Sequence, residues 1–299
     1  MAGHLLQFLC PRAPVPTGDP GSGTRRLTFL GTAGFVLEAP GRTLVLDPYL
    51  SRPGLFRTAF ARLASDEDLL RRVIPHADDV LCGHSHHDHA LDAPALCRLT
   101  GARLIGSSAT LHMGRAAGLP ESQMVLAGPM QGDAGARFPA IRCGDALATP
   151  IPSLHGKALF GRVPLPGDIV APPPWPPRVY ELRHGQVLLW LVDVAGVRVL
   201  HVDSAEFLVD DVRAAVGDEG VDVLCLCAVG RQYRKDYTRE IVAITRPKVV
   251  VPCHWDDFTL PYYTPPRQLP GVDVDAFCAE IRAAGSSAVV LGFGQSWAF

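Results

Sequence analysis

Apolar runs of strand length, separated by short turns rich in glycine and proline, organise the chain from residue 26 onward. The runs RLTFL (26–30), FVLEA (35–39) and TLVLD (43–47) are separated by GTAG and APGR, which predicts a meander of antiparallel strands. Farther along, strand-like runs alternate with segments of helical periodicity. This order predicts an α/β protein in which helices cover layered sheets.

The same pattern predicts where the later elements lie. The helix expected at 65–74 would open with a capping box formed by Ser65 and Asp68. The other helices are expected at 92–99, 108–117, 206–216, 236–245 and 273–284. Further strands are expected at 78–83, 103–106, twice within 136–153, and at 179–183, 187–192, 197–203, 221–227, 248–253 and 288–292.

Two segments interrupt this regularity. Residues 1–24 are rich in proline and glycine and are predicted to form a loosely ordered N-terminal tail. Residues 161–178 include VPLPGDIVAPPPWPP, which is too rich in proline for a helix or a central strand. Because strand-like runs resume directly afterwards, we interpret this segment as a flap within a single domain that spans residues 25–299.

Composition and charge narrow the classes of function. A net charge of -2 supplies no global basic field for a polyanion, so no nucleic-acid partner is expected. No apolar run approaches the roughly 20 residues of a membrane-spanning helix, so no stable membrane insertion is expected. The N-terminus makes a poor signal peptide, and the eight cysteines contain no CxxC pair. Together these features predict buried thiols and a cytoplasmic protein.

One short stretch carries the chemistry. Residues 82–92 read CGHSHHDHALD, which places four of the 11 histidines within six positions. Imidazoles and a carboxylate are donors for zinc, manganese or iron, whereas a solvated polar loop would have no reason to be so rich in histidine. Because one short loop cannot surround an ion, the cluster favours two metal ions that share the loop and take further ligands from elsewhere.

Three distant residues are candidates for those further ligands. His155, Asp203 and His254 each follow an apolar strand-like run, and sheets of α/β proteins usually place their sites just beyond the strand ends. The spacing between them is similar, at 48 and 51 residues. A lone histidine in a loop is often only polar surface, which is the alternative interpretation for His155.

These residues together resemble the metallo-β-lactamase fold superfamily of dinuclear metallohydrolases. The segment from His84 to His89 matches the HxHxDH motif of that family, and FLGTAGFVLEAPGRTLVLDPYL is similar to its first hairpins. The ending PCHWDDF is most similar to the branch of ascorbate-6-phosphate lactonase and N-acylphosphatidylethanolamine phospholipase D-like enzymes. The resemblance covers about residues 26–299 and implies a four-layer αββα sandwich.

The resemblance also implies a ligand set for two divalent ions. Zinc is the expected metal, and manganese or iron are the alternatives. Asp203 would bridge the two ions. Asp47 and His201 are expected to contact the ligands rather than the metal. His201 shares a strand face with Asp203, and its alternative interpretation is simple packing. Site one would be formed by His84, His86 and His155, and site two by Asp88, His89 and His254.

The expected reaction is hydrolysis. Two ions would lower the pKa of a shared water, and the resulting metal-bridging hydroxide would attack a carbonyl carbon or a phosphorus. Asp88 and Asp203 are the candidates for orienting that nucleophile or taking up a proton. The expected substrate is a small lactone, ester or phosphodiester, anionic or amphipathic in character.

Several side chains outside the ligand set are candidates for binding that substrate. RQYRK (231–235) follows a predicted strand, so its cationic groups would recognise an anion unless they form only a solvated turn. Aromatic residues after His254 and in the Pro-rich segment would form an apolar rim or, alternatively, pack elsewhere. The candidates are Arg231, Tyr233, Arg234, Trp175 and Trp255, whereas His4, His76, His112 and His184 are expected at the surface.

Two other classes compete with a small-molecule hydrolase. A nuclease of the same superfamily would need an extended basic track, which the sequence lacks. A non-catalytic or redox protein on this fold would replace histidine ligands or carry an added flavin module, and neither feature is present. A homo-oligomer is compatible with the sequence.

Overall fold

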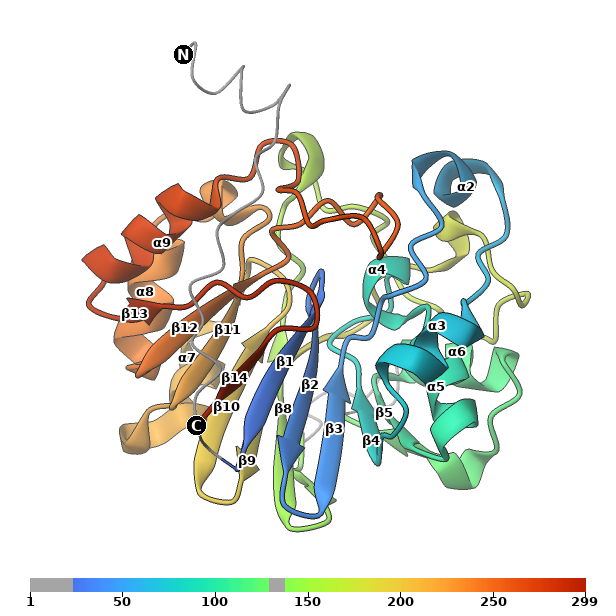
Figure 1. The fold of residues 1–299 in the computed structure, drawn as a ribbon, viewed down its shortest axis with the longest axis horizontal. Helices are drawn as coiled ribbons and strands as arrows, with labels where there is room; N and C mark the ends of the chain where they lie inside the picture. Colours follow the sequence, from blue (N-terminus) through green and yellow to red (C-terminus); the bar gives the residue numbers. More distant parts are fainter. Residues whose placement is uncertain (1–23, 129–137) are drawn as a thin grey trace.

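Two seven-stranded sheets lie face to face in the computed structural model, which describes residues 24–128 and 138–299 (Figure 1). The predicted N-terminal tail, residues 1–24, therefore lies outside the described residues apart from Thr24. The first sheet contains, in spatial order, β14 (Ser296–Ala298), β1 (Arg26–Gly31), β2 (Gly34–Ala39), β3 (Arg42–Leu46), β4 (Asp79–Leu81), β5 (Arg103–Gly106) and β6 (Met124–Leu126). The second contains β13 (Ser287–Ala288), β12 (Val249–Cys253), β11 (Val223–Cys227), β10 (Val197–Val202), β9 (Val187–Val194), β8 (Ala146–Ser153) and β7 (Ile141–Cys143).

Helices cover the outer face of each sheet, so the layers run helix, sheet, sheet, helix (Figure 1). This arrangement confirms the predicted α/β class and its four αββα layers. The first sheet is covered by α3 (Glu67–Val73), α5 (Ala93–Thr100) and α6 (Ser108–Ala116), and the second by α7 (Val209–Val216), α8 (Tyr237–Thr245) and α9 (Val274–Ala283). The remaining short elements are α2 (Leu55–Phe60), α4 (His87–Ala90), η1 (Glu121–Gln123), η2 (Leu159–Gly161), η3 (Val179–Glu181), η4 (Gly217–Glu219) and η5 (Arg231–Tyr233).

The first sheet is apolar on both faces because each face meets a different core. Along β3, Leu44 and Leu46 point into the core between the sheets, which also contains Trp190 of β9. Val45, between them, points the other way and joins the core that contains Leu96 of α5. Successive strand side chains alternate in this way, and each fully buried aliphatic group contributes about 1.5–3 kcal/mol.

Helix α3 begins one residue later than its capping pattern predicted. The side chain of Asp66 accepts a hydrogen bond from the Leu69 N–H at 3.0 Å, so Asp66 is the N-cap. The hydroxyl of Ser65 donates instead to the Leu91 carbonyl at 3.2 Å. The predicted capping box of Ser65 and Asp68 is therefore wrong, although the helix itself is present.

The predicted strand at 179–183 is also wrong, because these residues begin with the turn η3. The carboxylate of Glu181 accepts a hydrogen bond from the Arg178 N–H at 2.6 Å. This bond joins residues three positions apart and closes a turn, which excludes an extended strand here. The strand expected at 288–292 is reduced to the two residues of β13. Among the helices and strands, α2, α4, β6 and β14 were not predicted.

Buried cysteines and short helices characterise the residues that the structure describes. All seven cysteines among them are buried and none forms a disulfide, as expected for small apolar side chains. Within 24–128 and 138–299, no helix combines the length and the apolar character that crossing a membrane requires.

Candidate metal centre

The residues that could bind metal arrive from the carboxyl ends of five strands, drawn from both sheets. Asp47 follows β3, and the HxHxDH segment follows β4 and continues into the short helix α4. His155 follows β8, Asp203 follows β10 and His254 follows β12. The loops beyond these strand ends meet at one end of the sandwich, where a ligand site is expected in α/β sheets.

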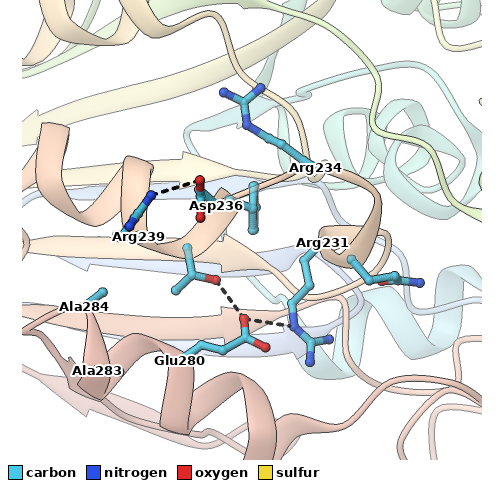
Figure 2. Close-up of a pocket in the computed structure, with 10 residues that line it drawn as sticks. Arg231, Arg234, Asp236, Arg239, Glu280, Ala283 and Ala284 are labelled. Carbon is cyan, nitrogen blue, oxygen red and sulfur yellow. Dashed lines mark hydrogen bonds and ion pairs between the residues drawn. The ribbon is translucent and has the colours of Figure 1, made fainter.

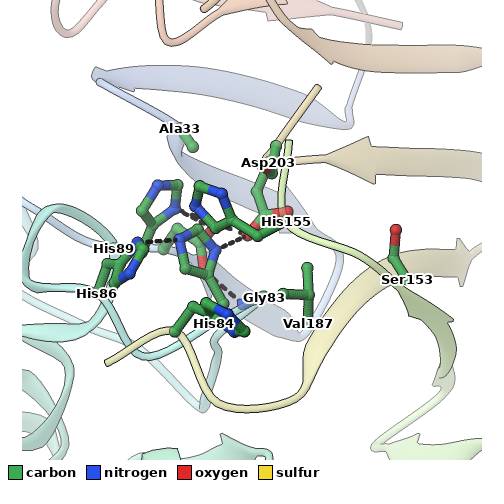
Figure 3. A network of polar contacts seen from close by, with 12 residues as sticks. Ala33, Gly83, His84, His86, His89, Ser153, His155, Val187 and Asp203 are labelled. Atoms are coloured by element: carbon green, nitrogen blue, oxygen red, sulfur yellow. Dashed lines mark hydrogen bonds and ion pairs between the residues drawn. The ribbon is translucent and has the colours of Figure 1, made fainter. Parts of the chain in front are cut away.

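One group of donors surrounds His84. Its Nδ1 lies 2.6 Å from Oδ2 of Asp203, and its Nε2 lies 3.1 Å from Nδ1 of His86. The ring of His155 lies 4.8 Å from that of His84 and 4.7 Å from that of His86, centroid to centroid. Figure 3 shows these imidazoles and the Asp203 carboxylate facing one another.

A second group forms around His89. Oδ2 of Asp88 lies 3.8 Å from Nε2 of His89 and 3.3 Å from Nε2 of His254. Nδ1 of His89 lies 3.7 Å from Oδ2 of Asp203, which also contacts the first group. Asp203 therefore lies between the two groups.

The donors form three overlapping triads, and within each triad the ligand atoms lie within 4.8 Å of one another. All the ligand residues expected from the sequence are brought together in this way. The two outer triads match the expected site one and site two, and the middle triad joins them through Asp203. The triads are His84, His86 and His155; His84, His89 and Asp203; and Asp88, His89 and His254.

The close approach of Asp203 depends on a glycine at the end of β4. A Cβ atom at Gly83 would lie 2.2 Å from Oδ2 of Asp203 and 3.0 Å from the Leu188 carbonyl oxygen. The absence of a side chain at this position therefore makes room for the carboxylate. The Gly83 carbonyl also accepts a hydrogen bond from the Leu188 N–H at 2.8 Å, which links the two sheets beside the site.

Asp47, which the sequence placed among the residues expected to contact the ligands, lies beside Gly83 and His89. One of its carboxylate oxygens accepts a hydrogen bond from the Gly83 N–H at 2.7 Å, and the other lies 2.9 Å from Nδ1 of His89. A carboxylate in this position fixes the orientation of the ring and leaves Nε2 of His89 facing Asp88. His201 lies elsewhere in the core, where its Nε2 donates to the Ala33 carbonyl at 2.8 Å.

Burial controls the charge of the cluster. Desolvation lowers the pKa of His84 and His89 well below the usual range and lowers the pKa of His86 to about 3. Burial alone would raise the pKa of Asp88, but the neighbouring imidazoles of His89 and His87 lower it instead. Neutral imidazoles beside an ionised carboxylate are the protonation states that a divalent ion requires.

The donor set fits metal ions better than it fits a self-contained polar network. Oδ1 of Asp203 is buried and accepts no hydrogen bond from the described residues. A buried carboxylate oxygen without a partner costs free energy, whereas a cation would satisfy it. Neutral nitrogen donors and carboxylates at this density suit zinc, manganese or iron.

Arg231 and Arg234, the residues expected to bind an anion, are paired with carboxylates of this chain. Nε of Arg231 lies 3.4 Å from Glu280, in a surface groove between α8 and α9 (Figure 2). Arg234 forms ion pairs with Glu206 and, at 2.7 Å, with Glu240. None of the metal-site donors lines the groove.

The three aromatic candidates have different environments. Trp255 is fully buried and stacks on Phe29 in the core between the sheets, so it cannot form a solvent-facing rim, and that prediction is wrong. Trp175 is half-buried and packs against the core beneath α3, α5 and α6. Tyr233 is 43% exposed and its ring lies beside the backbone of Gly161.

Two residues near the site were missed or misplaced by the sequence. His184 was expected at the surface, but its ring stacks on that of His155 with the centroids 5.6 Å apart. Arg52 is buried and forms an ion pair with Asp256 at 2.8 Å, two residues after His254. A lone histidine and a lone arginine in irregular segments carry no periodic or motif signal, so nothing in the sequence pointed to them.

Comparison with known proteins places this geometry in a family. The chain matches the Beta-lactamase superfamily domain over residues 26–254, a span that contains every residue of the three triads. A UPF0173 metal-dependent hydrolase of Anaeromyxobacter sp. (strain K) is 30% identical over 247 residues, which cover 79% of this chain and 76% of that protein. A UPF0173 metal-dependent hydrolase of Cupriavidus necator is 26% identical over 289 residues, which cover 94% of this chain and 87% of that protein.

Solved structures share the fold. Igni18, a metallo hydrolase of the archaeon Ignicoccus hospitalis, superimposes with a TM-score of 0.60 at 18% identity and covers 92% of this chain and 99% of its own. An isothiocyanate hydrolase from Delia radicum gut bacteria has a TM-score of 0.55 at 15% identity, covering 92% and 99% of the two chains. At these identities the likeness concerns the fold alone.

Proposed function

This chain belongs to the beta-lactamase superfamily, and from that membership and its cluster of donors we propose that it is a metal-dependent hydrolase with two metal sites. Site one would be formed by His84, His86 and His155. Site two would be formed by Asp88, His89 and His254. Asp203 would contact both ions, which we propose to be zinc, with manganese or iron as alternatives.

The overlap of the three triads carries this proposal. A single ion would use one triad and leave the remaining buried donors uncoordinated. Two outer triads joined by a carboxylate match instead the arrangement of a two-metal hydrolase, in which both ions face one reacting group. The relatives named metal-dependent hydrolases support the same class of reaction.

When bound, two divalent ions lower the pKa of a shared water and stabilise negative charge on a substrate oxygen. The chain's own residues would orient that water. Asp88 has a lowered pKa, so we expect it to stay ionised and accept a hydrogen bond from the water rather than store its proton. Asp203 offers its unpartnered Oδ1 at the junction of the triads and would be the second oxygen that positions the nucleophile.

The proposed substrate is a small molecule with an ester, lactone or phosphodiester bond and an apolar portion. Leu154, adjacent to His155, is 54% exposed, and Phe160, a few residues farther along, is 87% exposed. We expect these exposed apolar side chains, on the segment that carries His155, to contact the apolar portion of the substrate. An anionic substrate has less support than the sequence indicated, because Arg231 and Arg234 are already paired.

The metal content of protein purified without chelators or a histidine tag tests the proposal. We expect about two equivalents of zinc, manganese or iron per chain by mass spectrometry. The variants His86→Ala and Asp203→Ala should lose metal and abolish hydrolysis of any substrate found by screening lactones, esters and phosphodiesters. His112→Ala, which removes a half-buried histidine on α6, is the matched control.

The outcomes separate cleanly. Two bound ions together with activity that depends on His86 and Asp203 would support the dinuclear assignment. A soluble Asp203→Ala variant with near wild-type turnover would refute it. Protein that takes up no ion after incubation with each metal would favour the non-catalytic interpretation of this fold.

A further inference from the structure

His184 lies in an irregular segment between η3 and β9, yet its ring touches two of the proposed metal ligands. Its imidazole stacks on His155 at a centroid distance of 5.6 Å and an interplanar angle of 29°. It meets His86 edge-on at 5.9 Å and 84°. His184 is half-buried and belongs to none of the donor triads.

The hydrogen bonds of His184 show why it is not itself a ligand. Its Nδ1 lies 2.6 Å from the Gly185 carbonyl oxygen, so this nitrogen carries the proton and donates it. Its Nε2 accepts a hydrogen bond from the Gly167 N–H at 3.4 Å. Both ring nitrogens are therefore engaged by backbone groups, and no lone pair points toward His86 or His155.

The backbone around His184 ties two segments together. On one side, the His184 carbonyl accepts a hydrogen bond from the Ser85 N–H at 3.0 Å, within the HxHxDH motif. On the other side, the His184 N–H donates to the Leu165 carbonyl at 3.4 Å and the Gly185 N–H donates to the Gly167 carbonyl at 3.0 Å. His184 thus lies between the motif loop and the Pro-rich segment 161–178.

The Pro-rich segment also contacts a proposed ligand directly. The Leu165 carbonyl oxygen lies 3.4 Å from Nε2 of His86, whose Nδ1 faces Nε2 of His84 at 3.1 Å. A backbone carbonyl that accepts from one ring nitrogen selects the tautomer whose other nitrogen has a free lone pair. The same segment that holds His184 therefore also orients His86.

We propose that His184 is a positioning residue for site one: its ring limits rotation of the His155 and His86 imidazoles, so that both keep facing the point they share with His84. The inference rests on the proposed function, because it concerns the ligands of a metal site. Stacked and edge-on aromatic pairs restrict ring orientation, and groups that orient metal ligands typically change metal affinity by about 10- to 100-fold. The Pro-rich segment, through Leu165 and Gly167, sets the position of His184 in turn.

Two substitutions test this role through metal binding and not through activity. His184→Ala removes the ring, and His184→Phe keeps a flat ring without nitrogens. We expect His184→Ala to weaken one of the two zinc equivalents by about 10- to 100-fold, measured by competition with a chromophoric chelator. His184→Phe should retain more of that affinity. In the cobalt-substituted His184→Ala variant, the visible absorption of one metal site only should differ from that of the wild type.

His112→Ala, on α6, should leave both affinities unchanged. Equal weakening of both sites by His184→Ala, in step with a lower melting temperature of the metal-free protein, would show a merely structural residue and overturn the proposal. Unchanged affinities, or a Phe variant no better than the Ala variant, would overturn it as well. A wild-type protein that binds no zinc would instead refute the proposed function.

Discussion

Substitution of Gly83 by alanine should disable the proposed metal centre while leaving the fold intact. Gly83 follows β4 and directly precedes the HxHxDH motif. A Cβ atom there would lie 2.2 Å from Oδ2 and 2.6 Å from Cγ of Asp203, where ordinary contacts begin at 3.4 Å. The carboxylate must therefore retreat by about 1.2 Å, the difference between 3.4 and 2.2 Å, or the strand end must move.

This displacement is large on the scale that catalysis tolerates. A misplacement of about 1 Å typically costs on the order of 100-fold in rate, which corresponds to about 2.7 kcal/mol of transition-state stabilisation. The extra methyl group should also destabilise the fold by about 1–3 kcal/mol, as overpacking of a core does. Since Asp203 joins the two outer triads, we expect both of the proposed ions to bind more weakly.

The assay combines three measurements on Gly83→Ala: zinc affinity by chelator competition, turnover of a substrate found by screening, and denaturant unfolding. Gly106→Ala is the matched control, because a Cβ atom there would lie 2.8 Å from the side chain of Thr110 and would overpack the same sheet away from Asp203. The control should lose stability without losing metal. If Gly83→Ala kept both ions at wild-type affinity and turned over within about threefold of wild type, the inferred dependence on the position of Asp203 would be refuted.

Three further predictions follow from buried charge. Arg52→Met should lower the free energy of unfolding by about 3–5 kcal/mol in denaturant, because the side chains of Arg52 and Asp256 are 1% and 0% exposed and the remaining carboxylate would stay buried. Adding Asp256→Asn should restore much of this loss. A loss under about 1 kcal/mol for Arg52→Met alone would contradict the prediction. Burial lowers the pKa of His86 to about 3, so the unfolded chain takes up a proton at a higher pH than the folded one. The metal-depleted protein should therefore lose stability as the pH falls from about 6.5 toward 3. A denaturation midpoint independent of pH in that window would contradict this prediction. Arg234→Ala should change KM equally for anionic and neutral substrates, because its guanidinium is already paired with Glu240, and a rise confined to anionic substrates would return Arg234 to the substrate pocket.

Much of the fold was predictable because its signals are local. The apolar alternation of β1 to β3 and the helical periods of α5 to α9 lie within short windows, so the elements appear close to their predicted bounds. Short edge strands such as β6 and β14 have too few residues for a period to emerge. The segment 179–183 has the composition of a strand, but a hydrogen bond from the Arg178 N–H to the Glu181 carboxylate closes a turn there instead.

The candidate donors were predictable for a different reason. The HxHxDH segment is contiguous, and His155, Asp203 and His254 each follow a strand that the sequence shows clearly. The residue types also restrict the chemistry, because neutral imidazoles and carboxylates bind divalent metals. The sequence by itself therefore determined the class of the fold, the ligand types and the expectation of hydrolysis.

Tertiary structure alone decided which side chains surround those donors. Arg234 lies in a basic segment typical of anion binding, but the carboxylate of Glu240, on the adjacent helix, pairs with its guanidinium charge. His184 looks like a surface histidine, but the fold stacks it on His155, 29 positions earlier in the chain. Such contacts depend on how loops from separate strands meet in space. Only the packing of the two sheets brings these groups together, so no local period or motif in the sequence encodes the distance between them.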